Sequence, residues 1–334
     1  MATSFARRRS SDGSVVAARV NATIVAQGPP VAFFGNCVID DVLYVHGGVK
    51  TRGDTHPSNQ LYIFENNTWN DITTSSSPSL SYHRLIPYGK KYIISIGGWT
   101  GHERTSDICV YDIETKNWHK AHSTGFPEGG GLNNHAIISL RDGSILVSGR
   151  DGGLRTQRKH GDVYKLSGDP AKGTFRYEDY PISASSRSGH TLTAHGSSLF
   201  IIGGRADHFV ERYPGVKAEN LNNCDDLHSQ LKSILSEMTP MKKPPASRKD
   251  HTSVSCKDFA LIYGGETFDG RTRDPVGDTL VLHMSGGEEW FNLGPIEYGR
   301  QGHSISYING RLIVHGGLGP KALACSETFS LDFV

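Results

Sequence analysis

The sequence lacks the features that would suggest a membrane protein, a secreted protein or a nucleic-acid-binding protein. None of its apolar runs approaches the roughly 18 residues that a membrane-spanning helix needs. No apolar stretch follows the basic start MATSFARRRSSD, so no secretory signal is predicted. The 35 Lys and Arg residues nearly balance the 34 Asp and Glu residues, whereas a nucleic-acid-binding protein usually has a clear basic excess. We therefore expect a cytoplasmic protein, with the nucleus and the cilium as alternatives.

Cysteines are also few, and their spacing does not suggest a metal site. The chain has 5 cysteines, an odd number, and no two of them form a CxxC pair. We expect reduced thiols that mostly pack in the core, without a zinc framework. They are Cys37, Cys109, Cys224, Cys256 and Cys325.

Glycine, in contrast, is abundant and regularly placed. Five apolar runs end in a glycine pair, as in VLYVHGG at 42–48, and a sixth run, SILVSGR at 144–150, ends in Gly-Arg. The first glycines are separated by 50, 52, 54, 61 and 52 residues. This repeat predicts six equivalent units. The predicted glycine positions are Gly47, Gly48, Gly97, Gly98, Gly149, Gly203, Gly204, Gly264, Gly265, Gly316 and Gly317.

Two further markers recur in register with the glycines. A histidine stands 13 or 14 residues before the first glycine in five of the six repeats, and an aromatic residue often follows the next β-type run. The histidines are His83, His135, His190, His251 and His303. The aromatic markers are Trp69, Trp118 and Trp290, with Phe175 or Tyr177 in the third repeat and none in the fourth.

Each repeat therefore predicts four strands, of which the second is apolar throughout and covered on both faces. Four-stranded units of about fifty residues, stacked around an axis, form a β-propeller. The three markers resemble those of the kelch-repeat family, and the resemblance covers nearly the whole chain from about residue 30. The expected fold is an all-β, six-bladed kelch-type propeller, spanning 15–334 as one domain after a flexible basic tail at 1–14.

The two ends of the chain predict how the ring closes. After the sixth glycine pair, LACSETFSLDFV (323–334) has room for a third strand but not for a fourth. The β-type run VNATIV (20–25) has no other place in the repeat. We therefore expect this N-terminal strand to supply the missing outer strand of the last blade, which removes an open sheet edge.

The fourth repeat contains an insertion at about 214–246. Apolar residues in DDLHSQLKSILSEM (225–238) have the spacing of one helix face, with Asp225 or Asn223 as the expected cap. The helix either packs against the propeller or docks a partner, with Lys242 and Lys243 as a charged flank.

The resemblance implies that the segments before the first strand and after the glycine pair line one mouth of the channel. Arginines gathered there would suit carboxylates of an acidic peptide or a chain terminus, which they bind bidentately. Alternatively, each arginine pairs with a local acid such as Asp250 or Asp151. The loop after Gly149 is a candidate specificity loop and not a phosphate loop, because no helix follows it. The candidate partner-binding residues are Trp99, Arg150, Arg155, Arg187, Ser188, Arg205, Arg248, Glu266 and Arg300.

The expected function is that of a non-enzymatic scaffold. No catalytic residues, cofactor site or metal site are predicted, because the histidines occur once per repeat at equivalent positions and are therefore structural. The alternatives are a substrate-recognition subunit of a ubiquitin ligase with a separate adaptor, and a structural component of a ciliary or axonemal assembly. Within the family, the chain resembles a member linked to cyclin A1, which implies cyclin A1 as a partner. We expect a monomeric propeller.

One motif lies outside the repeats. Arg7-Arg8-Arg9-Ser10-Ser11 fits the target sequence of a kinase that selects basic segments. The alternative is that these residues form a solvated tail without a specific role.

Overall fold

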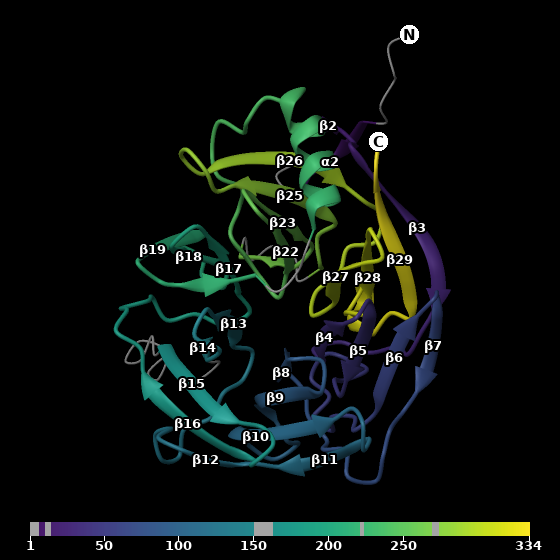
Figure 1. Ribbon diagram of the computed structural model, residues 1–334. Coiled ribbons are helices and arrows are strands. Elements are labelled where there is room, and N and C mark those ends of the chain that lie inside the picture. The colour runs from purple at the N-terminus through teal and green to yellow at the C-terminus, as the bar shows by residue number, and fades with distance from the viewer. Residues whose placement is uncertain (1–6, 11–14, 150–162, 221–223, 269–273) are drawn as a thin grey trace.

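The computed structural model describes residues 7–10, 15–149, 163–220, 224–268 and 274–334. Its strands form six blades around a central axis, with the first strand of each blade beside that axis (Figure 1). The predicted six-bladed propeller is confirmed. In the described part of the chain, no helix has both the length and the apolar composition needed to cross a bilayer.

The blades follow one another along the chain. Blade 1 contains β4 (Gly35–Ile39), β5 (Val42–His46), β6 (Leu61–Glu65) and β7 (Thr68–Asp71), and blade 2 contains β8 (Arg84–Tyr88), β9 (Tyr92–Trp99), β10 (Arg104–Asp112) and β11 (Asn117–Lys120). Blade 3 contains β13 (Ala136–Leu140), β14 (Ile145–Ser148), β15 (Val163–Asp169) and β16 (Thr174–Asp179). Two short strands extend its sheet, namely β12 (His122–Thr124) beside β16 and β20 (Ala218–Glu219) beside β13.

The second half of the ring is less regular. Blade 4 contains β17 (Thr191–His195), β18 (Ser198–Ile202) and β19 (Val210–Pro214), and the described residues give it no fourth strand. Blade 5 contains β22 (Thr252–Cys256), β23 (Phe259–Tyr263), β25 (Asp278–His283) and β26 (Glu289–Pro295). On the channel-mouth side of blade 5, β21 (Arg248–Lys249) pairs with β24 (Glu266–Thr267). Strands such as β18 and β23 are buried along their whole length, as their continuous apolar sequence predicts.

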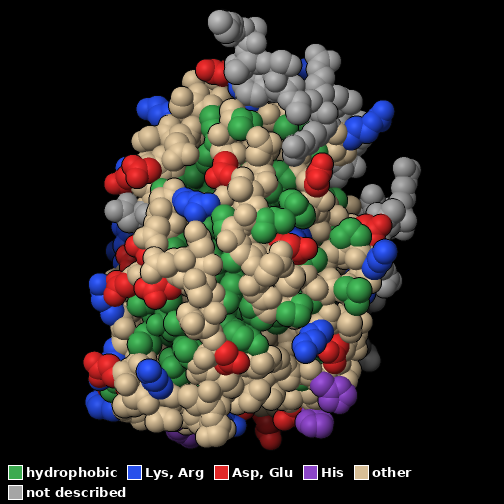
Figure 2. All heavy atoms as spheres, turned by 90° about the vertical axis from the view of Figure 1, so that its right-hand side faces the viewer, with side chains coloured by type: hydrophobic (Ala, Val, Ile, Leu, Met, Phe, Trp, Pro, Cys, Tyr) green, Lys and Arg blue, Asp and Glu red, His purple; other side chains and the backbone are tan. Residues whose placement is uncertain are grey.

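The N-terminal strand closes the ring. Blade 6 contains β27 (Ser304–Ile308), β28 (Arg311–His315), β29 (Glu327–Phe333) and β3 (Val20–Gln27), with the short 3-10 helix η1 (Pro320–Ala322) before β29. β3 lies antiparallel to β29, from Val20 opposite Phe333 to Gln27 opposite Glu327. The predicted closure is confirmed, and the strand extends past the expected residue 25 to Gln27. On this side of the molecule, acidic and basic side chains are intermixed (Figure 2).

Part of the segment expected to be a tail is structured. Arg7–Arg9 (β1) pairs antiparallel with Val15–Ala17 (β2), because the residues before β3 offer a backbone partner, and both strands contact β26. Residues 7–9 are therefore part of a strand and not of a flexible tail.

The insertion packs onto the propeller. Its helix, α2 (Asp225–Ser236), buries Leu227, Leu231 and Leu235 in the core cluster shared by blades 5 and 6. This favours the packing alternative over a docking helix. The expected cap is wrong for Asp225, which lies in the first turn after Cys224 at the N-cap position, and the helix start has no side-chain cap. Asn223, the other expected cap, lies outside the described residues.

The aromatic markers join neighbouring blades. Trp118 and Trp290 are buried, as are Phe175 and Tyr177, and Trp69 is half-buried. Trp290 of blade 5 stacks on Phe209 beside blade 4 with ring centroids 4.9 Å apart. Trp69 of blade 1 donates from Nε1 to Thr328 Oγ1 of blade 6 at 2.9 Å. Large aromatic plates therefore fill the contacts between sheets.

Candidate functional site at the mouth of the central channel

A closed ring of backbone hydrogen bonds surrounds the channel at one end. Each blade contributes the residue just before its repeated histidine, or before Phe34, which stands in that place in blade 1. All six ring residues have a left-handed backbone, with φ from 54° to 66°. Each N–H donates to the carbonyl oxygen of the ring residue in the preceding blade, at 2.7–3.0 Å. The ring residues are Phe33, Tyr82, Asn134, Gly189, Asp250 and Gly302.

Two of the ring positions are glycines because neighbouring ring side chains lie across them. A Cβ on Gly302 would lie 2.6 Å from Phe33 Cδ1, and a Cβ on Gly189 would lie 3.2 Å from Asn134 Nδ2. Phe33 stacks on Tyr82 with ring centroids 4.4 Å apart. Asn134 donates from Nδ2 to Asp250 Oδ1 at 2.7 Å. The ring side chains therefore lie along the rim and contact one another.

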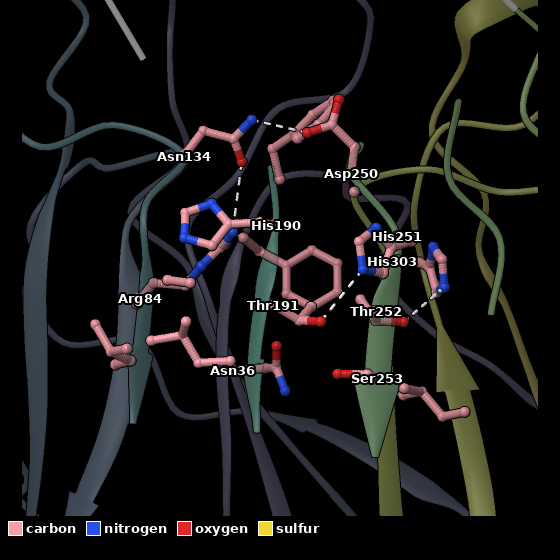
Figure 3. Close-up of a pocket in the computed structure, with 17 residues that line it drawn as sticks. Asn36, Arg84, Asn134, His190, Thr191, Asp250, His251, Thr252, Ser253 and His303 are labelled. Atoms are coloured by element: carbon pink, nitrogen blue, oxygen red, sulfur yellow. Dashed lines mark hydrogen bonds between the residues drawn. The ribbon is translucent and has the colours of Figure 1, made fainter. Parts of the chain in front are cut away.

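A hollow of about 230 Å³ lies below this ring, lined by the first strands of several blades (Figure 3). Arg84 extends along its wall, donating from Nε to the carbonyl of His135 at 2.7 Å and from Nη2 to Asn134 Oδ1 at 3.4 Å. Burial lowers the pKa of Arg84 to about 10 and raises the pKa of Asp250. The hollow is therefore lined by a guanidinium and a carboxyl group, which are linked through the amide of Asn134.

The repeated histidines pack between blades. A Cβ on Gly203 would lie 2.5 Å from His251 Cε1, and a Cβ on Gly264 would lie 2.7 Å from His303 Cε1. Both glycines also have positive φ, so no other residue fits these turns without strain. His251 and His303 share hydrogen bonds with threonine hydroxyls of the preceding blade, at 3.2 and 2.8 Å (Figure 3). Among the described residues, no three metal-ligating side chains are placed to hold an ion together.

The burial of the repeated histidines, and of His315 at the end of β28, predicts acid sensitivity. Burial lowers the pKa of His251, His303 and His315 from 6.5 to about 3. Between these values the unfolded chain binds more protons than the folded chain, so the free energy of unfolding falls as pH falls. The loss approaches about 1.4 kcal/mol per pH unit for each histidine.

Urea unfolding at about pH 7.5 and about pH 5 measures this dependence. The variant His303→Gln should reduce the slope with pH, whereas His119→Gln, at an exposed position on β11, should leave it unchanged. Equal stability at both pH values would contradict the prediction.

Three of the predicted binding arginines form hydrogen bonds and ion pairs within their own blades. Arg187, Arg248 and Arg300 each donate from Nη1 to the carbonyl of the first glycine of the pair 16 residues later, at 2.7, 3.1 and 2.8 Å. Their Nη2 atoms pair with acids of the third strand or its start: Glu211, Asp278 and Glu327, respectively.

These three arginines are at most 3% exposed, so they do not offer guanidiniums to a partner at the mouth. Each pairs with an acid of its own blade, as the alternative expected, although the acid is not Asp250. Asp151, the other acid named there, lies outside the described residues. The backbone of these arginines also contributes: Gly204 and Gly265 donate their N–H to the carbonyls of Arg248 and Arg300 in the next blade, at 2.8 and 2.7 Å. Each glycine turn is thereby fixed from two blades.

The remaining candidates lie on the loops of this face. Arg205 chelates Asp207 through Nε and Nη2, at 2.8 and 2.6 Å. Glu266 is buried and accepts from Arg52 Nη2 of blade 1 at 3.2 Å. Trp99 is half-buried at the end of β9 and donates from Nε1 to the carbonyl of Thr55 at 3.1 Å. Arg150 and Arg155 lie outside the described residues.

One hollow on this face is lined by three of the candidates, counting the buried Arg187. It has a volume of about 450 Å³ and includes Ser188 and Arg205, together with Lys249 and Phe268. Lys249 and Phe268 were not predicted from the sequence. Lys249 follows Arg248 directly and could have been found by the spacing of the repeat, whereas Phe268 carries no repeat signal.

The comparisons with known proteins agree with this arrangement. Residues 17–204 match the family model described as "KLHDC2/KLHL20/DRC7 Kelch-repeats domain". The chain belongs to the kelch-repeat family. Kelch domain-containing protein 9 of Mus musculus is 29% identical over 88% of this chain and 89% of its own length, and the Homo sapiens protein of that name is 28% identical over 87% and 88%.

A solved structure, titled "Structure of YjhT", shares this kelch fold. It superposes with a TM-score of 0.63 at 14% identity, covering 91% of this chain and 95% of the other. At that identity the likeness extends to the fold alone. The kelch propeller is typically a protein-interaction module, which is the level of function that the family supports.

Proposed function

We propose that this chain is a non-enzymatic protein-interaction module that presents the loop face around the channel mouth to a protein partner. The observation that carries the proposal is the 450 Å³ hollow between the loops of blades 4 and 5. Phe268 is 40% exposed at its edge, although large apolar side chains are mostly buried in the described residues. An exposed aromatic ring beside cationic side chains is typical of the anchor positions in protein interfaces.

The charge of the hollow favours an acidic segment of the partner. None of the ion pairs among the described residues involves Lys249, and we infer that its ammonium is the contact for a partner carboxylate. Arg205 already forms a bidentate ion pair with Asp207, so a partner carboxylate would compete with that pair. We therefore infer a partner that brings a carboxylate to Lys249 and an apolar side chain to Phe268.

The double variant Lys249→Glu/Phe268→Ala tests this site. Affinity purification followed by mass spectrometry should recover the wild-type partner, and the variant should recover about tenfold less of it or lower. The matched control is Lys172→Glu, which reverses an exposed charge on the outer turn between β15 and β16. Equal recovery by the double variant, with an unchanged melting temperature, would place the interaction elsewhere.

The same purification distinguishes the candidate partners. Recovery of cyclin A1 with its kinase would support the partner implied by resemblance. Recovery of ligase adaptor subunits would support a role in substrate recognition, and recovery of ciliary proteins would support a structural role in that assembly. The compartment of the recovered proteins also tests the proposed cytoplasmic location against the nucleus and the cilium.

A further inference from the structure

The hairpin formed by β1 and β2 occupies a prepared position on the outer strand of blade 5. The pairing between β25 and β26 shifts next to Thr279, where Leu293 is the extra residue of a bulge. The carbonyl of Leu293 accepts from the N–H of Arg19 at 2.7 Å. A Cβ on Gly294 would lie 3.0 Å from Ala18 Cα, so the glycine permits close approach of the N-terminal segment.

Ser10 is fixed in this position. Its side chain is buried, with a relative exposure of 6%, and its Oγ accepts a hydrogen bond from Asn292 Nδ2 at 2.8 Å. The orientation of the Asn292 amide is set by its own Oδ1, which accepts from the N–H of Gly294 at 2.9 Å. The bulge therefore orients the Asn292 amide, and this amide donates the hydrogen bond to Ser10.

Ser10 is also one of the two serines of the basic motif in the sequence. Arg7 and Arg8 stand three and two residues before it, the positions that basic-selective kinases recognise, and both belong to β1. Residues 7–10 of the motif are thus part of a docked element, and the sequence alternative of a solvated tail does not describe them.

We propose that Ser10 is a phosphorylation site whose modification keeps the β1–β2 hairpin detached from blade 5. A protein kinase would supply ATP. The Oγ of Ser10 forms a bond to the γ-phosphorus, the bond from that phosphorus to the bridging oxygen breaks, ADP leaves, and the hydroxyl proton passes to the base of the kinase.

The burial of Ser10 makes the modification conditional. A kinase binds its target segment as an extended peptide, so β1 must separate from β2 and Ser10 must separate from Asn292 before transfer. Such local openings of a small element cost far less than global unfolding. The kinase therefore acts on the detached fraction of the chain.

The phosphate then opposes redocking. It adds about −1.5 to −2 charges and three acceptor oxygens to a residue whose docked position is almost closed to solvent. Desolvation of that charge costs more than one amide donor, Asn292 Nδ2, can offset. Since only the detached state accommodates the phosphate, modification raises the free energy of the docked state and shifts the population toward the detached state.

Phosphorylation of the intact chain tests the proposal. Cyclic-AMP-dependent protein kinase with Mg-ATP is applied to the full chain and to a peptide of residues 4–14, both with Ser11→Ala so that only one serine of the motif can react. Mass spectrometry locates and times the modification. Ser10 in the full chain should react roughly 10- to 100-fold more slowly than in the peptide, because only the detached fraction is a substrate.

The variant Asn292→Ala should raise the rate in the full chain several-fold, and Asn117→Ala, at an exposed amide on β11, should not. After phosphorylation, hydrogen exchange should accelerate in residues 7–10 and 15–17 and stay unchanged in the blades.

Three results would overturn the proposal. Equal rates in chain and peptide would show that Ser10 is not held. Modification of the peptide, but of neither the full chain nor its Asn292→Ala variant, would show a purely structural serine. Unchanged exchange in residues 15–17 after stoichiometric phosphorylation would show that the docked hairpin accommodates the phosphate.

Discussion

A chain that starts at residue 30 is expected to lose its cooperative unfolding transition and to aggregate. It lacks β3, so β29 becomes an open edge along its whole paired length. The truncation also removes Val20, which is fully buried in the cluster shared by blades 5 and 6. Since a domain of ordinary stability has only about 5–15 kcal/mol in total, loss of a complete strand should remove most of it.

Circular dichroism during heating and size-exclusion chromatography measure this effect. The control is a chain that starts at residue 19, which keeps β3 but lacks the β1–β2 hairpin and should melt close to the full chain. If the chain from residue 30 stays monomeric and melts as sharply as the full chain, the closing strand does not stabilise the ring.

Replacement of Arg248 by methionine is expected to destabilise the protein by about 3–5 kcal/mol, the usual result of removing one partner from a buried ion pair. The side chains of Arg248 and Asp278 are 1% and 3% exposed, and the guanidinium also holds the Gly264 carbonyl at 3.1 Å. The variant therefore leaves a buried carboxylate and a buried carbonyl without their donor.

Urea unfolding gives the change in free energy. Arg205→Met is the matched control, because Arg205 pairs with a half-exposed Asp207 and should lose less than about 1 kcal/mol. The double variant Arg248→Met/Asp278→Leu should recover part of the loss, since no charge then remains unpaired. A loss for Arg248→Met as small as that for Arg205→Met would show that this pair does not stabilise the blade.

The arginines show where sequence reasoning reached its limit. Their spacing before the histidines is repeated, and the family resemblance implies a place for them near the mouth. Whether an arginine faces solvent depends on an acid far along the chain: Asp278 lies 30 residues after Arg248, and Glu327 lies 27 after Arg300. No local pattern marks those acids as partners. The sequence alone therefore did not distinguish arginines that bind a partner from arginines that pair with acids of their own blade.

The hollow at the mouth shows the same limit. Ser188 and Arg205 were predicted from the family resemblance, whereas Lys249 and Phe268 reach the same hollow from the loops of blade 5. Phe268 comes after the glycine pair, where loop length and course vary between repeats. Its exposure follows from the packing of neighbouring loops and not from its own sequence context.

The sequence by itself determined the number of blades, the place of each glycine turn and the strand that closes the ring. These features follow from local rules: positive φ favours glycine, buried strands are continuously apolar, and an incomplete last repeat needs a strand from the other end. The tertiary structure alone decided which polar groups are buried and which partners they pair with. It buried Arg248 against Asp278, seated Ser10 on Asn292, and joined one residue from each blade into the hydrogen-bonded ring at the mouth. Each of these outcomes depends on residues brought together from distant repeats, and the desolvation and pairing of a polar group are properties of that assembled environment.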